Sequence, residues 1–465
     1  MQETTKSRFR SNREVDMTKG NLLPKILKFA LPLMATGVLQ LLFNAADMVV
    51  VGQFVGDVAL AAVGATSNIV NLLVNLFMGL AIGAGIVMAK HYGAKNEEEA
   101  QRLIHTAMPL SLILGVAVLF IGLFSSYPLL VLLKTPENCL PLSNQYLSIY
   151  FLGAPFLMLY NFGASMLRAI GDTVRPLIYL TIAGVLNVIV NLITVIVFNM
   201  GVAGVAYATI TSQGVSAVLV VISMLKEKGY ARYDIKKSAI KKKPLFDILK
   251  LGVPSGIQSS LFSISNSLIQ STINSFGDVV LAANTASQGL EGFVFIVMNA
   301  ISTTASTAVG QNYGAGNVDR IKESVVKCLI CSVILSATVS LTIYLFRVPL
   351  LSLYTESSES IAIACERITI ILATYIFFGL MDVMSQAMRG MGYSIIPMLI
   401  VLIGTCVFRV AWIFVVFPFN PVYTNVILSY SVSWMVTLVI ATVFFLILFK
   451  KRKKQLTSAQ MREIL

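Results

Sequence analysis

Histidine, cysteine and charged residues are all scarce in this sequence of 465 residues. It has two histidines, His91 and His105, and five cysteines, and 12% of its residues are charged, against about 25% in soluble proteins. Two histidines leave almost nothing from which to build a histidine-based metal site or a catalytic triad. The low charge beside 56% hydrophobic residues excludes an ordinary soluble protein and indicates a chain that is dissolved in lipid.

The cysteines do not form a recognisable metal or redox motif. Cys328 and Cys331 make a CxxC pair, but they lie in an apolar run with no second pair and no histidine nearby. We interpret them as small core residues. The net charge of +13 does not indicate nucleic-acid binding, because the basic residues gather at the ends of apolar runs and not along an aromatic-bearing groove.

Long apolar runs predict an all-α integral membrane protein with twelve transmembrane helices. Each run is long enough to cross a hydrocarbon core of about 30 Å. The predicted spans are 23–52, 57–91, 101–125, 139–168, 175–198, 202–225, 246–276, 279–312, 321–346, 359–389, 395–417 and 423–449. Basic residues follow the even-numbered spans, fill the connector 226–245 and occupy the tail, so the positive-inside rule places both termini in the cytoplasm.

Three motifs recur later in the chain. VGDVALAA from Val55 returns as FGDVVLAA from Phe276, HYGAKN from His91 as NYGAGN, and LRAIGDTVRP from Leu167 as MRGMGYSIIP, all with an offset of 221 residues. We therefore predict an N-terminal six-helix lobe (20–225), a basic cytoplasmic linker (226–245) and a C-terminal six-helix lobe (246–450).

The predicted repeat also gives the relative orientation of the two lobes, and it leaves a segment at each end of the chain outside them. An even number of spans in each lobe implies a repeat axis along the membrane normal, as in alternating-access transporters. Residues 1–19 are predicted to form a disordered cytoplasmic extension, in which Met17 offers an alternative start, and residues 451–465 to form a cytoplasmic tail.

Asp47 is the only acidic residue of the first predicted span. Spacings of four and three residues place Gln40, Asn44 and Asp47 on one helical stripe. A carboxylate near the middle of a membrane is costly, so it is a functional hypothesis by default; the alternative is a position near the headgroups, where it reaches water.

The first half holds polar groups where the second half has other residues. Asn187 and Asn191 lie one turn apart on the fifth predicted span, and Thr209 lies on the sixth. With Asp47 they form a candidate site whose ligands are all oxygens, which suits Na⁺ better than a transition metal; a proton on Asp47 is equally plausible. The alternative is that the asparagines join helices through amide hydrogen bonds.

The second half carries three charged residues inside predicted spans: Glu291, Asp382 and Arg409. A buried arginine needs a carboxylate, and either acid would serve, which leaves the other to attract a cationic substrate. The alternative is a structural ion-pair network. Glu366 and Arg367 lie near the outer end of their span, and we expect them to be solvated.

These motifs together resemble those of the multidrug and toxic compound extrusion (MATE) family from Gly20 to Lys450. The resemblance rests on Asp47 followed by Gly52, on the two GDV repeats, and on GAGIVMAKHYGA, TASTAVGQNYGA, LRAIGD and MRGMG. It is closest to bacterial members that export drugs. It implies a two-lobe antiporter in the bacterial cell membrane that expels organic cations in exchange for H⁺ or Na⁺.

The resemblance also implies roles for particular residues. Asp47 matches the coupling acid of the family, and Asn187 and Thr209 match polar ligands of its cation site. Asn191 stands where some members have a second acid, and Asp382 lies about one turn from an acid of other members. We assign Gln40, Asn44, Glu291, Asp382 and Arg409 to the substrate cleft.

We therefore expect a monomeric multidrug efflux antiporter with no enzymatic activity. It would need no cofactor beyond a coupling Na⁺, and its partners would be small-molecule drugs, organic cations and membrane lipid, not nucleic acid. The alternative is a flippase for a lipid-linked saccharide, which would need several arginines to bind pyrophosphate. A membrane-embedded enzyme ranks last, because the sequence has no HExxH motif and no paired catalytic aspartates.

Overall fold

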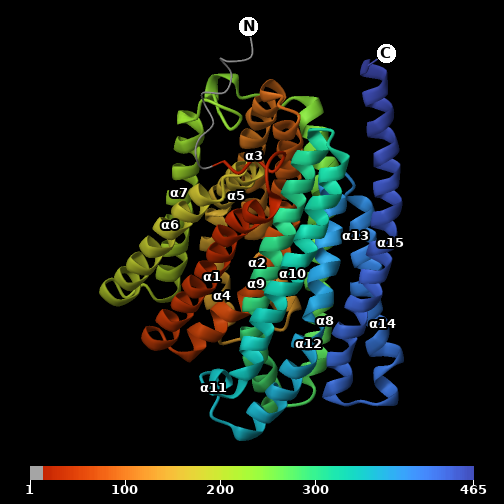
Figure 1. The fold of residues 1–465 in the computed structure, drawn as a ribbon. Coiled ribbons are helices and arrows are strands. Elements are labelled where there is room, and N and C mark those ends of the chain that lie inside the picture. Colours follow the sequence, from red (N-terminus) through yellow and green to blue (C-terminus); the bar gives the residue numbers. More distant parts are fainter. Residues whose placement is uncertain (1–13, 465) are drawn as a thin grey trace. The chain divides into compact units, whose positions relative to one another are not determined.

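The computed structural model describes residues 14–464, and within that range the chain forms helices and no strand (Figure 1). The helices of the first half are α1 (Leu22–Phe54), α2 (Asp57–Gly93), α3 (Glu97–Leu132), α4 (Leu140–Leu152), α5 (Ala154–Ala169), α6 (Val174–Leu192) and α7 (Gly201–Lys226). Those of the second half are α8 (Lys242–Asn274), α9 (Asp278–Gly314), α10 (Val318–Leu345), α11 (Arg347–Leu351), α12 (Ser358–Gly390), α13 (Ile395–Val401), α14 (Phe408–Val415) and α15 (Tyr423–Ile464).

These helices coincide with the twelve predicted spans. Ten are long and apolar enough to cross a membrane when α6 and α13–α14 are counted with the turns that continue them. The pair α4 and α5 forms one more span, bent by 50° at Gly153, where Pro155 prevents a regular helix. Helix α8 is long enough but too polar to count by hydropathy, because serine, asparagine and glutamine fill its second half. The all-α prediction is confirmed.

The internal repeat appears in the backbone as well as in the sequence. Gly56 precedes α2 with a φ of 106°, and Gly277 precedes α9 with a φ of 91°. Gly171 and Gly392, in the third pair of motifs, have φ angles of 97° and 87°. Residues with a side chain rarely adopt such angles, which explains why glycine recurs in both copies.

The chain divides into two compact units. Unit 1 comprises residues 14–16 and Leu31–Ser260, and unit 2 comprises Met17–Ala30 and 261–464. The divisions fall inside α1 and α8. The linker 226–245 is packed in unit 1, where His105 on α3 accepts a hydrogen bond from the Asp234 amide through Nε2 (3.0 Å) and one from the Ala239 amide through its carbonyl oxygen (3.1 Å).

Residues 14–19 are packed, so for them the prediction of a disordered extension is wrong; residues 1–13 lie outside the described range. In unit 1, the Val15 amide donates to the Gly171 carbonyl oxygen (3.2 Å). In unit 2, the fully buried Met17 donates its amide to Oε1 of Gln311 (2.9 Å). The apolar side chains of Val15 and Met17 explain the docking, because burial removes them from water.

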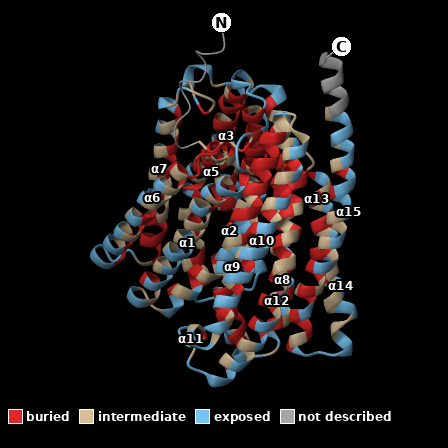
Figure 2. Ribbon diagram, in the orientation of Figure 1, coloured by how far each residue is buried: buried red, intermediate tan, exposed pale blue. Residues whose placement is uncertain are grey.

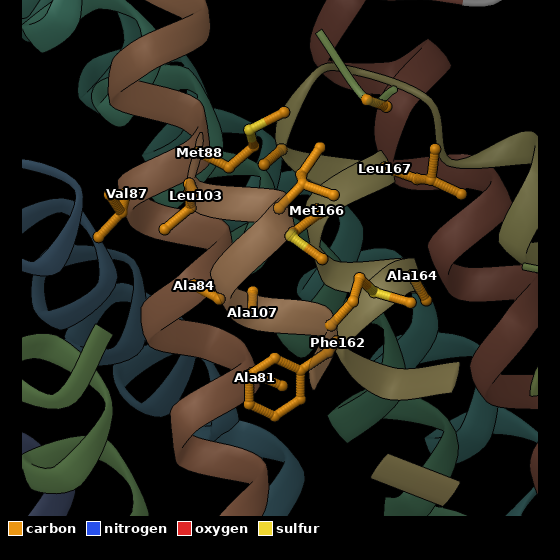
Figure 3. Close-up of a cluster of buried hydrophobic side chains, with 14 of the residues drawn as sticks. Ala81, Ala84, Val87, Met88, Leu103, Ala107, Phe162, Ala164, Met166 and Leu167 are labelled. Carbon is orange, nitrogen blue, oxygen red and sulfur yellow. The ribbon is translucent and has the colours of Figure 1, made fainter. Parts of the chain in front are cut away.

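The core of unit 1 lies where α2, α3 and α5 meet. Figure 3 shows small and large side chains interleaved there: Ala81, Ala84, Val87 and Met88 from α2, Leu103 and Ala107 from α3, and Phe162, Ala164, Met166 and Leu167 from α5. Outside this core, α3 carries exposed apolar residues between Leu112 and Leu132, as expected of a helix that faces lipid. Figure 2 shows buried, intermediate and exposed residues along the helices.

Four glycines allow α2 to touch the first half of α8 within unit 1. A Cβ atom on Gly79 would lie 2.1 Å from the backbone nitrogen of Gly256, and one on Gly83 would lie 2.6 Å from that of Gly252. Backbone atoms cannot move aside as a flexible side chain can. The crossing of these helices therefore requires glycine.

We expect Gly79→Ala to destabilise the purified protein by at least 1–3 kcal/mol, because the added methyl group overpacks a backbone contact. Gly64→Ala is the matched control, since a Cβ at that position of α2 meets no atom within 4 Å. Thermal unfolding in detergent measures both. Equal midpoints for the two variants would contradict the close helix crossing.

Candidate functional site

The carboxylate of Asp47 on α1 has an amide as its hydrogen-bond partner. Nδ2 of Asn191 on α6 donates to Oδ1 of Asp47 at 2.6 Å. Across residues 14–464, none of the ion pairs includes Asp47. The structure therefore places Asn191 against Asp47, and among the described residues it leaves the charge of Asp47 without a cationic partner.

Two amide oxygens of α6 are buried beside this contact without a hydrogen bond. Oδ1 of Asn187 and Oδ1 of Asn191 have no partner among the described residues, and the two side chains are 5% and 0% exposed. A buried acceptor without a donor costs about 1–3 kcal/mol, so such atoms mark a place where a cation or a water fits.

The backbone widens directly after this pair. Helix α6 passes into a π-helical turn, Ile193–Val197, immediately beyond Asn191. Oγ1 of Thr194 donates to the carbonyl oxygens of Val190 (2.8 Å) and Gly204 (3.0 Å), which joins α6 to α7. π-helical turns are often found at functional sites.

Two tyrosines of α4 complete the cluster. Tyr146 interacts with Thr209 on α7 and electrostatically with Asp47, and Tyr150 lies beside Gln213, one turn further along α7. We did not predict Tyr146, Tyr150 or Gln213 as site residues. Tyr146 and Tyr150 on α4 are four residues apart, as are Thr209 and Gln213 on α7. This spacing indicates one face on each helix, but it does not reveal that α4 and α7 are neighbours.

Gln40 and Asn44 are exposed on α1 and belong to the same stripe as Asp47. Thr209 is half-buried and donates to the Val205 carbonyl oxygen (3.0 Å). The structure thus brings Asp47, Asn191 and Thr209 into one cluster, with Asn187 one turn away on α6, and it leaves Gln40 and Asn44 on the surface of the unit.

The charges of unit 2 are paired differently from the prediction. Arg367 is 1% exposed, not solvated, and it binds both carboxylate oxygens of Glu291, at 2.9 and 3.1 Å. It also donates to Oδ1 of Asn284 (2.8 Å). Asp382 interacts with Ser302 and Arg389. The expectation that Glu291 or Asp382 pairs with Arg409 is therefore wrong. Glu291 binds Arg367 and Asp382 interacts with Arg389, and both arginines lie on α12.

A second buried network in unit 1 contrasts with Asp47. Asp172 is 0% exposed, forms an ion pair with Nε of Arg175, and accepts the Arg175 amide (3.0 Å) at the start of α6. Nη1 of Arg175 also binds Oε2 of Glu227 (2.6 Å). Both carboxylates are held by one guanidinium, so this network has a structural role.

Two repeated bundles of spanning helices, with a carboxylate that lacks a cationic partner in one of them, define a membrane transporter of the internal-repeat class. A family model described as MatE matches residues 32–193 and again 254–415. The two matches cover more than half of the chain and begin 222 residues apart, within one residue of the offset of the sequence repeat. The chain belongs to the MATE family of multidrug efflux transporters.

Relatives and solved structures agree with this assignment. The probable multidrug resistance protein YpnP of Bacillus subtilis is 30% identical over 88% of this chain and 90% of its own length. The multidrug export protein MepA of Staphylococcus aureus is 22% identical over 83% of this chain and 88% of its own. A MATE transporter solved in an outward-facing conformation superposes with a TM-score of 0.89, at 22% identity over 96% of this chain and 100% of that one.

We expect Asp47→Asn to cost the protein much less stability than Asp172→Asn. An amide at position 47 still accepts from Asn191, so the cost should be below about 1 kcal/mol. An amide at position 172 weakens a buried ion pair, and we expect a loss of about 3 kcal/mol. Thermal unfolding in detergent compares them. A larger loss for Asp47→Asn would mean that Asp47 is a structural residue.

Proposed function

We propose that this protein is an efflux antiporter that exports lipophilic, often cationic, compounds in exchange for H⁺ or Na⁺. The observation that carries the proposal is the Asp47 carboxylate, which has an amide partner and no cationic one. The names of the relatives YpnP and MepA support export of drugs as the task. We place both termini in the cytoplasm and take the monomer as the working unit.

The coupling ion binds at the Asp47 cluster in this proposal. A proton neutralises the carboxylate directly, whereas Na⁺ would be held by Asp47 together with the free oxygens of Asn187 and Asn191. Either ion cancels a charge inside the hydrocarbon layer, and each elementary charge that moves inward contributes about 2.3 kcal/mol per 100 mV.

Helix α1 transmits the change in this proposal. Pro32 lies inside α1 and removes one backbone hydrogen bond, and its carbonyl oxygen accepts from Oγ1 of Thr36 (2.7 Å). A helix weakened at one turn can bend when the contact between Asp47 and Asn191 changes. Gln40 and Asn44, exposed between this turn and Asp47, are the proposed substrate contacts on α1.

The flippase alternative gains no support from the arginines of unit 2. Within the described range, Arg367 is neutralised by Glu291 and Arg389 lies beside Asp382, which leaves Arg409 as the buried arginine without a carboxylate. One such guanidinium is fewer than a pyrophosphate group would require.

We expect Asp47→Asn to abolish gradient-driven ethidium efflux from membrane vesicles, because the variant cannot bind and release the coupling ion. Transport should fall to the level of vesicles without the protein, at normal expression. A pH gradient and a Na⁺ gradient, imposed in turn, identify the ion. Glu137→Gln, which neutralises an exposed carboxylate outside the spans, is the control and should retain activity. Full efflux by Asp47→Asn would refute the coupling role.

If Na⁺ is the coupling ion, it should raise the unfolding temperature of the protein relative to choline at equal ionic strength. Binding to the folded state at one hundred times the dissociation constant stabilises by about 2.7 kcal/mol. Asn187→Leu should remove most of this effect, since it deletes a free buried oxygen. Gln145→Leu, on the exposed face of α4, should keep it. A Na⁺ effect that survives in Asn187→Leu would place the ion elsewhere.

A further inference from the structure

Arg409 on α14 is a charged side chain inside a span that has only neutral partners. It is 1% exposed, and its Nε donates to Oγ of Ser433 (2.9 Å) while Nη1 donates to Oδ1 of Asn266 (3.3 Å). Its Nη2 has no hydrogen-bond partner among the described residues. A buried guanidinium in this state is costly, so a structural role does not account for it.

The acids that would neutralise Arg409 are already engaged. Both oxygens of Glu291 bind Arg367, and Asp382 interacts with Arg389. None of the ion pairs in the described part of the chain includes Arg409. Among the described residues of unit 2, the buried guanidinium of Arg409 therefore has no carboxylate partner.

Aromatic rings surround this guanidinium. Its Cζ atom lies 4.2 Å from the ring centroid of Tyr430, 5.6 Å from that of Trp434 and 5.7 Å from that of Phe262. Cation–π contacts of this kind are worth about 0.5–2 kcal/mol each, which holds the charge in place without neutralising it. They also provide flat apolar surfaces on which another ring can stack.

Residues beside Arg409 are only partly buried. Phe262, Asn266 and Tyr430 are half-buried, and Ser267 next to Asn266 is exposed. Asn266 accepts from Nη1 through a long hydrogen bond, so a stronger acceptor can take its place. A ligand that displaces this amide meets both terminal nitrogens of Arg409, and two parallel N–H groups match the two oxygens of a carboxylate.

We propose that Arg409 and the rings of Phe262, Tyr430 and Trp434 form a binding site for the carboxylate of an aromatic compound. The carboxylate would accept from Nη1 and Nη2, and its ring would stack beside Tyr430. The inference rests on the proposed efflux function and names a subsite for those of its substrates that are aromatic compounds with a carboxylate. An anionic lipid headgroup offers similar oxygens, and the experiment separates the two.

The experiment measures equilibrium binding, with no gradient, to the full chain in detergent. Trp412→Phe leaves Trp434 as the only tryptophan, whose fluorescence then reports on this site. The probes are 2-naphthoate, 2-naphthamide and 2-naphthylmethylammonium, which differ in charge on one ring system. We expect 2-naphthoate to quench Trp434 and to bind at least tenfold more tightly than the other two probes.

Variants of Arg409 test the cause of this preference. Arg409→Gln should remove the tenfold preference and raise the unfolding temperature, because an uncompensated charge is lost. Arg409→Lys should keep a reduced preference, since it retains the charge without the paired nitrogens. Arg347→Gln, which removes a half-buried arginine of the same unit that binds the Tyr344 carbonyl oxygen, should leave the tenfold preference unchanged.

Three results would overturn the proposal. The first is equal binding of the three probes, and the second is a preference for 2-naphthoate that survives in Arg409→Gln. The third is displacement of 2-naphthoate by phosphatidylglycerol but not by phosphatidylcholine in nanodiscs, which would assign the site to lipid. Because no ion gradient is present, loss of binding here is distinguishable from failure of coupled efflux.

Discussion

The membrane interior allows few charged side chains, and each one must be neutralised, satisfied or used. Inside the spans of unit 2, Glu291 binds Arg367 and Asp382 lies beside Arg389. At the ends of spans in unit 1, Asp172 and Glu227 share Arg175. Asp47 and Arg409 depart from this rule. The paired charges hold helices together, whereas the two unpaired ones impose a cost that folding alone does not explain.

The two units share a backbone plan but not a chemistry. Glycines with positive φ recur at 56 and 277, and asparagine caps recur at 96 and 317, so the turns between helices were kept after duplication. The side chains diverged: Asn191 corresponds to Trp412, which donates to Asn425 (3.0 Å) and faces Phe408. One unit came to hold free oxygens and a carboxylate, the other a guanidinium among rings.

The spans, the internal repeat and the proximity of Asp47 to Asn191 could be predicted from the sequence. Apolar runs of membrane length admit little but a helix, and the charge of Asp47 within such a run drew attention to Asn191. What the sequence could not supply was the choice among partners. Periodicity places Arg367 and Asp382 on faces of one helix, but it does not say that Glu291 reaches the first and Arg389 the second.

Tyr146 was missed for the same reason, because a tyrosine in an apolar span is ordinary until the neighbouring helix is known. Sequence periodicity gives the face of a helix; tertiary packing decides which face it meets. The prediction of disorder failed for residues 14–19 because Val15 and Met17 are apolar, and short runs of this kind dock when a matching surface exists.

A coupling residue must be weakly held before its ligand arrives. A ligand shifts an equilibrium only by its difference in affinity for two states, so a carboxylate already saturated by arginine has little left to gain. Releasing Asp172 or Glu291 would cost about 3–5 kcal/mol, more than one charge gains from 100 mV. In the proposed mechanism, Asp47, with one amide donor, would exchange that bond for an ion at far lower cost. The same argument makes Arg409, rather than Arg367, the guanidinium of unit 2 that a transported anion can engage.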